Sequence, residues 1–442
     1  MKQIIFVVLF ALLASFSYFW YIGEYAFILA PVEFFIFSLT TLHYSKVWQF
    51  VILSLPILTV AGFLAGRNMI VGSGIILVAG ASALGFTSVF TVYKLLFSKV
   101  FAKVSPKVNL IVSGIVFGLL VVSLEYLFGI INPFGAWTSS GYVLFPILEY
   151  LNWLPVFGSF GVYFYSFLYA IFSYFVFMLI ANFDNKDKRA LLAKFLVGII
   201  LIGFIIPAFL IFSDDNKNKN KNLRVGLVNS QTSAGDNMYN KLDRIQVIAD
   251  NSDIVLTGEA FFRFNDPEQQ LEAFGRLSRT AIETNSYIFV GLISIGENLQ
   301  YDRSNKLVGW SPKGEIIMNY TKAKLLPDEV NIYNQGESQI PFVDTEFGRI
   351  GGVICFDSDH PEYIAQSKSL SLDYLLVPVK EWSGIARRHT QQIAFRAKEN
   401  KITVINSAVN GTNRITDYDG KEIFSSRAKV DGESDIVVEI KK

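Results

Sequence analysis

The sequence contains very little cysteine, histidine or charge. Among its 442 residues are one cysteine, Cys355, and three histidines, and 17% of the chain is Asp, Glu, Lys or Arg. One cysteine excludes an internal disulfide, and the histidines lack the spacing of metal ligands, so we expect no metal and no cofactor. A formal net charge of +1 gives no basic excess that would indicate a nucleic-acid partner.

Apolar residues are abundant and gather in the first half of the chain. Hydrophobic residues make up 52% of the sequence, and the mean hydropathy is +0.38. Residues 1–213 hold 11 Lys and Arg and 6 Asp and Glu, whereas the remainder holds 28 and 32. This split predicts a transmembrane helical bundle at 1–213, a polar linker at 214–222 and a water-soluble domain at 223–442.

The apolar half predicts about seven membrane spans. A span needs about 20 apolar residues, and suitable segments lie at 3–22, 25–43, 48–66, 69–97, 108–132, 159–182 and 195–213. The stretch 141–158 contains Pro146, Glu149, Asn152 and Pro155, so we expect it to be re-entrant or interfacial.

The distribution of basic residues predicts the orientation of these spans. With the N-terminus inside and seven spans, ten of the eleven Lys and Arg residues up to 213 face the cytoplasm, and only Arg67 lies outside. Cytoplasmic loops are enriched in Lys and Arg. The pattern therefore predicts a multi-pass membrane protein whose soluble domain is extracytoplasmic.

Three of the six acidic residues of the membrane half fall within its apolar segments. Glu33 and Glu125 lie within expected spans, and Glu149 lies in the 141–158 stretch. Intramembrane carboxylates usually face a cavity or a partner, but one near the end of a span can reach the headgroups. Both interpretations stay open for Glu33 and Glu149, and Glu125 is the deeper of the three.

From residue 223 the pattern becomes that of an α/β domain. A helix over 266–285 begins with Asp266 as N-cap and Pro267 at its first position. Further helices are expected at 237–250, 360–368 and 386–400, and strands at 223–229, 253–257, 287–295, 306–311, 316–320, 350–355, 374–379, 402–407, 413–417 and 435–440. This order predicts a layered α-β-β-α sandwich.

Three reactive residues follow three of these strands. They are Glu259 in Val255–Ala260, Lys322 in Tyr320–Pro327 and Cys355 in Gly351–Asp357. A thiol is a weak nucleophile until a base takes its proton, and a poorly solvated carboxylate can be that base. A lysine ammonium can stabilise the resulting oxyanion, together with the backbone N–H that follows the nucleophile.

Each of these residues also has an ordinary structural interpretation. Glu259 could be a strand-end carboxylate, Lys322 a surface lysine and Cys355 an inert core thiol. His360 and His389 could act as bases, although polar loop positions are the better interpretation for both. The sequence alone leaves open whether the three motifs meet.

The motifs resemble the Glu-Lys-Cys triad of the nitrilase, or carbon–nitrogen hydrolase, superfamily. The segment Gln391–Asn400, with its Arg-Ala-x-Glu core, and the segment Asn406–Thr412 extend the resemblance over 223–442. The resemblance implies that Glu259 is the base, Lys322 the oxyanion-stabilising cation and Cys355 the nucleophile. It also points to supporting roles for Phe356 and Asp357.

The whole chain resembles the apolipoprotein N-acyltransferase family of bacterial inner membranes. Asn132–Trp137 and Gly158–Tyr163 are similar to its membrane signatures, and Tyr320–Pro327 to its lysine motif. The resemblance implies that Cys355 takes an acyl chain from a phospholipid and passes it to the N-terminal amine of diacylglyceryl-cysteine apolipoproteins. Substrates and membrane lipids would be the partners, in a ping-pong scheme.

The sequence departs from that family in several places. Gly258 stands where a proline usually precedes the base, Asp357 replaces a glutamate, and the 323–354 arm is short. The arm usually carries a further essential glutamate, for which Glu329 is the nearest candidate. Two alternatives therefore stay open: a membrane-tethered amidase or hydrolase, and a non-catalytic lipid-binding relative.

Overall fold

The computed structural model describes residues 46–52, 55–56, 59, 74–99, 106–131, 139–182, 185–208, 222–229, 237–296, 302–382, 385–427 and 435–441. The chain divides into two compact units, Met1–Ile211 and Phe212–Lys442. The expected spans 3–22 and 25–43, Glu33, Arg67, the 132–137 motif and almost all of the expected linker lie outside the described residues.

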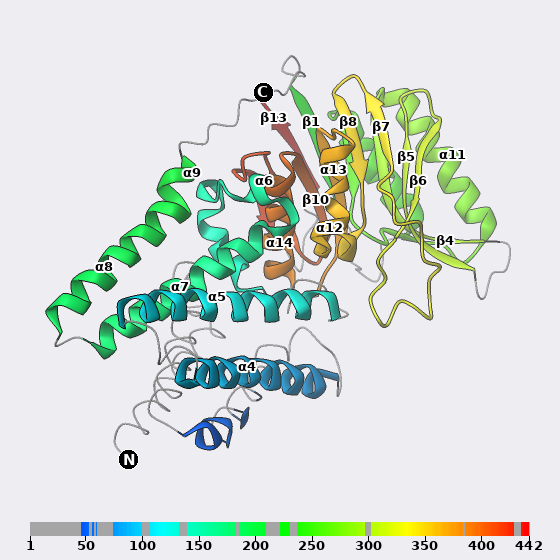
Figure 1. The fold of residues 1–442 in the computed structure, drawn as a ribbon. Helices are drawn as coiled ribbons and strands as arrows, with labels where there is room; N and C mark the ends of the chain where they lie inside the picture. Colours follow the sequence, from blue (N-terminus) through cyan, green and yellow to red (C-terminus); the bar gives the residue numbers. More distant parts are fainter. Residues whose placement is uncertain are drawn as a thin grey trace. The chain divides into compact units, whose positions relative to one another are not determined.

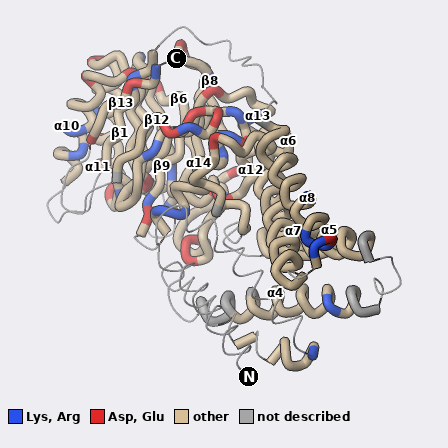
Figure 2. Tube along the Cα trace, turned by 90° about the vertical axis from the view of Figure 1, so that its left-hand side faces the viewer, with Lys and Arg blue, Asp and Glu red and all other residues tan. Residues whose placement is uncertain are grey.

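The first unit is helical (Figure 1). Its longest helices carry few charged residues, which appear as isolated blue or red segments on a tan tube in Figure 2. The elements are α4 (Gly74–Lys99), α5 (Pro106–Ile131), η3 (Ser140–Tyr150), α6 (Leu154–Phe157), η4 (Gly158–Phe160), α7 (Gly161–Ala181), α8 (Lys186–Ile200), the π-helical turn η5 (Leu201–Ile205) and α9 (Ile206–Ala208).

Two stretches among the described residues are long and apolar enough to cross a membrane, Val108–Ile131 and Leu154–Ala181. They correspond to the expected spans at 108–132 and 159–182. The described part of the expected span at 195–213, up to Ala208, lies on helical residues that begin earlier, at Lys186, where the Asn185 side chain accepts a hydrogen bond from the Lys188 N–H. The seven-span bundle is therefore not confirmed.

Close packing of α5 on α7 depends on two glycines. An added Cβ at Gly114 would lie 2.9 Å from Tyr174, and one at Gly118 would lie 2.5 Å from Ile171. The rings of Phe117 and Tyr174 lie 6.0 Å apart across the same contact. Small residues allow such close approach of apolar helices, for which dispersion contacts supply the attraction.

The 141–158 stretch is a broken segment. The 3₁₀-helix η3 contains Pro146 and a non-helical Ile147, and the chain turns again before α6. Glu149 is exposed on this segment, whereas Glu125 is 3% exposed. The Glu125 carboxylate accepts hydrogen bonds of 3.2 Å from the Ser139 hydroxyl and the Ser140 N–H, so this deep carboxylate fixes the start of η3.

The second unit contains two sheets. The first has the order β13-β1-β2-β4-β5-β6 with β3 beside β4, and the second has the order β12-β11-β10-β9-β8-β7. The strands are β1 (Leu223–Val228), β2 (Ile254–Thr257), β3 (Phe262–Arg263), β4 (Tyr287–Ile295), β5 (Arg303–Trp310), β6 (Ile316–Thr321), β7 (Phe342–Thr345), β8 (Gly348–Gly352), β9 (Tyr374–Lys380), β10 (Thr403–Val409), β11 (Thr412–Thr416), β12 (Glu422–Arg427) and β13 (Ile436–Ile440).

Helices cover the outer faces of both sheets (Figure 1). Helices α10 (Met238–Ala249) and α11 (Pro267–Thr284) pack on the first sheet, and α14 (Ala386–Asn400) packs on the second. The short helices α12 (Pro361–Ile364) and α13 (Gln366–Ser369) replace the single helix expected at 360–368. The observed layers are those of an α/β sandwich.

One apolar core fills the space between the sheets and a second lies under α10 and α11. The first includes Leu256, Leu376 and Ile405, and the second includes Ile245 and Leu277, all fully buried. Burying one such side chain stabilises a fold by about 1.5–3 kcal/mol. The two cores hold the strand ends in place.

The sequence did not predict the strands β3, β7 and β12, and one predicted strand, β8, ends early. β3 has two residues, and β7 and β12 lie at a sheet edge, where polar and half-exposed residues weaken the alternating pattern. The strand expected to run through Cys355 ends at Gly352. Cys355 instead opens the 3₁₀ turn η6 (Cys355–Asp359).

We expect Gly291→Ala to destabilise the protein by about 1–3 kcal/mol, because overpacking of a tight site has that cost. An added Cβ at Gly291 would lie 2.5 Å from the Gly258 carbonyl oxygen and 3.0 Å from the Glu259 Cα. The measurement is the thermal unfolding midpoint of the purified full-length protein. As a control, Gly275→Ala in α11 meets nothing within 4 Å and should raise the midpoint. An unchanged midpoint for Gly291→Ala would contradict this packing.

Candidate active site

The lone cysteine occupies a strained turn between a buried strand and a short helix. Cys355 has a backbone φ of +46°, in the left-handed region that non-glycine residues rarely adopt, and it is 5% exposed. Close approach of the two sheets underlies this position, since an added Cβ on Gly352 would lie 2.6 Å from Leu307. Such strain costs about 1–3 kcal/mol and clusters at functional sites.

Glu259 follows β2 where the two sheets meet. Its backbone N–H donates to the Val379 carbonyl at the end of β9 (3.3 Å), and the next residue, Ala260, has a φ of +51°. Gly258 lets the chain pass here, because an added Cβ would lie 2.5 Å from the Val409 side chain. The glycine that stands in place of the expected proline therefore fits the space left by Val409.

The structure brings Glu259, Lys322 and Cys355 together. The Lys322 Nζ lies 2.9 Å from the Glu259 Oε1, and their side chains are 1% and 5% exposed. The charges of Glu259 and Lys322 both act on the Cys355 thiol. Lys322 follows β6, so the three side chains come from the ends of β2 and β6 and the turn after β8.

Glu329 joins this group from the other side of the lysine. Its Oε1 accepts a 2.9 Å hydrogen bond from the Lys322 Nζ, and its Oε2 accepts one from the Leu326 N–H, also 2.9 Å. The Glu329 side chain is 15% exposed. The glutamate suggested by the family resemblance thus reaches the lysine from a turn in the short arm.

Charge pairing sets the protonation of the lysine and the base. Burial opposes the charged forms, but the nearby carboxylates hold the pKa of Lys322 well above its usual value. Burial also opposes the charge of Glu259, yet the Lys322 ammonium holds the pKa of Glu259 below its usual value. At neutral pH the pair is an ammonium and a carboxylate.

The Cys355 thiol, in contrast to Lys322 and Glu259, favours its neutral form. Burial, followed by the negative charge of Glu259, raises the pKa of Cys355 well above its usual value. The resting nucleophile is therefore a neutral thiol beside an ionised carboxylate. That arrangement suits proton transfer from sulfur to carboxylate when an electrophile arrives.

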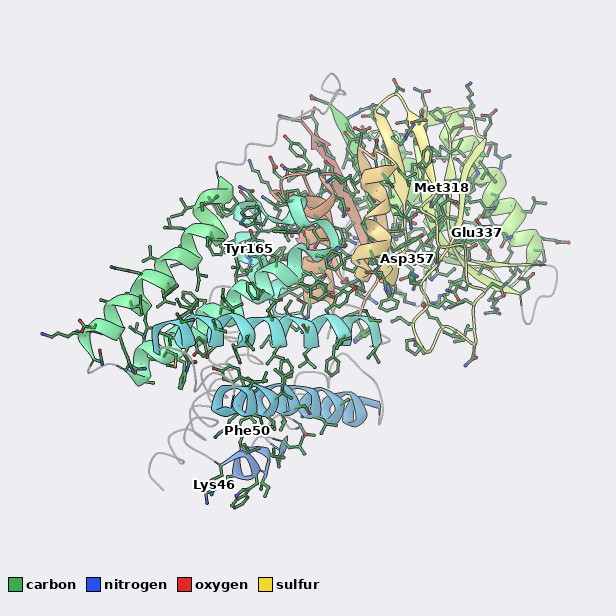
Figure 3. All side chains as sticks on the ribbon, viewed as in Figure 1. Lys46, Phe50, Tyr165, Met318, Glu337 and Asp357 are labelled. Atoms are coloured by element: carbon green, nitrogen blue, oxygen red, sulfur yellow. The ribbon has the colours of Figure 1, made fainter. Side chains whose placement is uncertain are left out.

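Asp357 ties the nucleophile turn to the lysine strand. Its Oδ2 accepts hydrogen bonds of 2.8 Å from the Tyr320 hydroxyl and the Ile354 N–H, and its Oδ1 accepts a 2.7 Å bond from the Lys324 N–H. Burial raises the pKa of Asp357 to about 6, so it is ionised at neutral pH. Figure 3 labels this residue beside the helices that follow the turn.

Phe356 packs beside the nucleophile. Its side chain is 3% exposed, and its ring centroid lies 5.0 Å from that of His360. Its backbone N–H directly follows Cys355 in the chain, which is the usual position of an oxyanion-stabilising donor.

The sequence did not predict two further groups that contact Glu259. The Asn305 Nδ2 donates a 2.7 Å hydrogen bond to the Glu259 Oε1, and the Lys380 backbone N–H donates a 2.9 Å bond to the Glu259 Oε2. Asn305 gives no distinct sequence signal, because it lies in the polar first half of β5 beside Ser304 and Lys306. A backbone donor such as that of Lys380 leaves no sequence signal.

His389 is not the solvated loop residue that the sequence suggested. It lies on α14 and is 1% exposed, with its Nδ1 2.9 Å from the Glu381 Oε1 and its Nε2 3.3 Å from the Asp359 Oδ2. Burial opposes its charge, but Asp359 and then Glu381 raise the pKa of His389 to about 10. The sequence prediction was wrong because the polar start of a helix can face the protein interior when buried acidic residues lie next to it.

His360 differs from His389. It ends the nucleophile turn, its side chain is 20% exposed, and its Nδ1 lies 3.5 Å from the Glu362 Oε1. His360 is therefore a peripheral residue of the turn.

Comparison with known proteins shows what the segment around this site is similar to. The carbon-nitrogen hydrolase family model matches residues 248–431, a range that includes Glu259, Lys322 and Cys355. An apolipoprotein N-acyltransferase from Geobacter metallireducens is 25% identical over 343 residues, which cover 69% of this chain and 64% of the relative. A 2-oxoglutaramate amidase from Bacillus subtilis is 26% identical over 151 residues, which cover 34% of this chain and 57% of the relative.

The matches span less than two thirds of the length of either curated relative. Among solved structures, an amidase from Nesterenkonia sp. aligns with 49% of this chain and 90% of its own, at 20% identity and a TM-score of 0.44. The family model and the sequence matches confirm the resemblance that the motifs predicted. Residues 248–431 match the carbon-nitrogen hydrolase family, in a chain that is similar to apolipoprotein N-acyltransferases.

Proposed function

We propose that this protein is a phospholipid:apolipoprotein N-acyltransferase of a bacterial cell membrane, with its catalytic domain outside the cytoplasm. The observation that supports it is the extent of the acyltransferase match, 69% of the chain. The second unit, Phe212–Lys442, amounts to about half of the chain, so that match extends into the helical unit. A hydrolase of soluble substrates needs no such unit.

The first half-reaction acylates the cysteine. Glu259 takes the proton of the Cys355 thiol as the sulfur attacks an ester carbonyl carbon of the phospholipid. The Lys322 ammonium and the Phe356 N–H stabilise the oxyanion that forms. The carbon–oxygen bond to the glycerol then breaks, Glu259 returns the proton to that oxygen, and a lysophospholipid leaves a thioester on Cys355.

The second half-reaction transfers the acyl chain to an amine. The neutral α-amine of a diacylglyceryl-cysteine attacks the thioester carbonyl and gives a proton to Glu259. Collapse breaks the carbon–sulfur bond, and Glu259 returns the proton to the Cys355 sulfur. The products are an amide and the original thiol, in keeping with a ping-pong scheme.

The surrounding residues have separate tasks in this scheme. Glu329 and Glu259 both face the Lys322 ammonium at 2.9 Å, so the cation stays fixed when Glu259 becomes neutral. Asp357 holds the backbone of Ile354 and Lys324 and so sets the distance between nucleophile and cation. Neither Glu329 nor Asp357 needs to exchange a proton.

An amidase is the second candidate, and the 26% match to 2-oxoglutaramate amidase favours it. In that case an amide replaces the phospholipid ester, and water replaces the amine in the second step. The same three side chains serve both reactions. The acyl donor and the acceptor therefore distinguish the two functions.

The purified full-length protein should gain one acyl mass when it is mixed with a defined phospholipid. The adduct should be removed by hydroxylamine, because a thioester is labile to that reagent, and Cys355→Ala should show none. Intact-protein mass spectrometry is the measurement. A folded wild-type protein that gains no mass from any of several phospholipids would argue against the acyltransferase.

The acyl-enzyme should discharge faster to an amine than to water. Adding a peptide with an N-terminal diacylglyceryl-cysteine should remove the adduct and add the same mass to the peptide. An N-acetylated peptide is the matched control, since it has no free amine. Equal rates of loss with and without the free amine would favour the hydrolase.

Alkylation of Cys355 by iodoacetamide should have its midpoint at a pH above that of an ordinary thiol. The thiolate is the reactive form, and the pKa of Cys355 is raised. Glu259→Gln should move the midpoint to lower pH, because the negative charge of Glu259 is one cause of the raised pKa, and should still abolish acylation. Acylation by this variant at the wild-type rate would exclude Glu259 as the base.

A further inference from the structure

A buried histidine of α14 connects the two segments that hold the nucleophile and the base. His389 lies at ion-pair distance from Asp359 in the nucleophile turn (3.3 Å) and from Glu381 after β9 (2.9 Å). All three side chains are at most 1% exposed. We call His389, Asp359 and Glu381 the histidine bridge.

The first arm of the bridge reaches the carbonyl of the nucleophile. Asp359 is the last residue of η6, the turn that begins at Cys355. Ser358 donates a 2.6 Å hydrogen bond to the Cys355 carbonyl, and its hydroxyl lies 3.5 Å from the His389 Nε2. A shift of the imidazole would therefore move the end of the strained turn.

The second arm reaches the backbone donor of the base. Glu381 directly follows Lys380, whose N–H donates to the Glu259 Oε2 (2.9 Å). The Glu381 N–H is itself fixed by the Val409 carbonyl at 2.9 Å. The position of Lys380 relative to Cys355 thus depends on where Glu381 is held.

We propose that His389 is a positioning residue for acyl transfer, which fixes the Cys355 turn against the Lys380 N–H by bridging Asp359 and Glu381. The inference rests on the proposed function and adds a residue that touches none of the reacting atoms. The bridge supplies a second support for the strained turn, in addition to the hydrogen bonds of Asp357.

Electrostatics make the bridge sensitive to loss of the histidine. The groups that face it include Asp359 from η6, Glu381 from the end of β9 and the hydroxyl of Ser358. Without the imidazolium, two buried carboxylates would face the same space and repel each other. Either the turn or the end of β9 must then move, and both carry groups of the active site.

The test compares acylation of full-length variants with a defined phospholipid. We expect His389→Gln to lower the acylation rate at saturating donor at least tenfold, and to leave the half-saturating donor concentration within twofold of wild type. Glu381→Gln keeps an oxygen for the His389 Nδ1 but removes the charge, so its acylation rate should fall between those of the wild type and His389→Gln. It also serves if His389→Gln does not fold.

Two control variants separate positioning from loss of stability. His360→Gln changes the peripheral histidine of the same turn and should acylate at the wild-type rate. Ser286→Ala removes a buried hydroxyl that donates to the carbonyls of Ala249 and Ser252, just before β4 and at the opposite end of the strands from Glu259. It should lower the thermal midpoint without changing the acylation rate.

The outcomes are distinct from those that test the proposed function. Wild-type acylation rates in folded His389→Gln and Glu381→Gln would overturn the positioning role, as would a change in half-saturation alone. If the wild type acylates with no phospholipid, the proposed function fails, and alkylation by iodoacetamide still tests the bridge. His389→Gln should then shift the alkylation midpoint of Cys355 to higher pH, and an unchanged midpoint would contradict the role.

Discussion

A buried ammonium between two carboxylates is the constraint on which the rest of the catalytic unit depends. Lys322 lies 2.9 Å from both Glu259 and Glu329 in a place almost closed to water. Removing one partner of a buried ion pair costs about 3–5 kcal/mol, so the three side chains persist only together. Two sheets, an apolar core and a loop converge to keep those charges in contact.

The nucleophile is held by geometry and kept inactive by charge. Strain at Cys355 and Ala260 directs the sulfur and the base toward each other, while Gly258, Gly291 and Gly352 let the backbones approach closely enough. Burial, together with the negative charge of Glu259, keeps the proton on sulfur by raising the pKa of Cys355. In the proposed reaction, the Cys355 thiol therefore becomes reactive only when a substrate carbonyl is present. Attack of the sulfur on that carbonyl forms the thiolate and moves negative charge toward Lys322.

Much of the catalytic unit could be predicted because its signals are local. Alternating and continuous apolar runs located most strands, and Asp266 with Pro267 marked the start of α11, where the Asp266 side chain accepts from the Glu268 N–H. Edge strands such as β7 were missed because half-exposed residues give no clear period. In the first half, the expected number of spans goes beyond the two long apolar stretches among the described residues.

The candidate site was predictable only where its chemistry resides in side chains near strand ends. Glu259, Lys322 and Cys355 follow apolar runs, but their meeting depends on which strands pair, and no local pattern records that. Asn305 and the Lys380 N–H contribute through their place in the sheets. His389 was misplaced because burial of a polar helix start depends on acids more than seven residues away in the chain.

The protonated resting state of Cys355 also bears on oxidative damage. Oxidants attack the thiolate rather than the thiol, and compartments outside the cytoplasm are oxidising. In the extracytoplasmic location that we propose, a sulfur that is 5% exposed and keeps its proton is protected, and a chain with one cysteine offers it no second thiol for an internal disulfide. In the mechanism that we propose, the carboxylate that takes the thiol proton during turnover thus also protects the sulfur between turnovers.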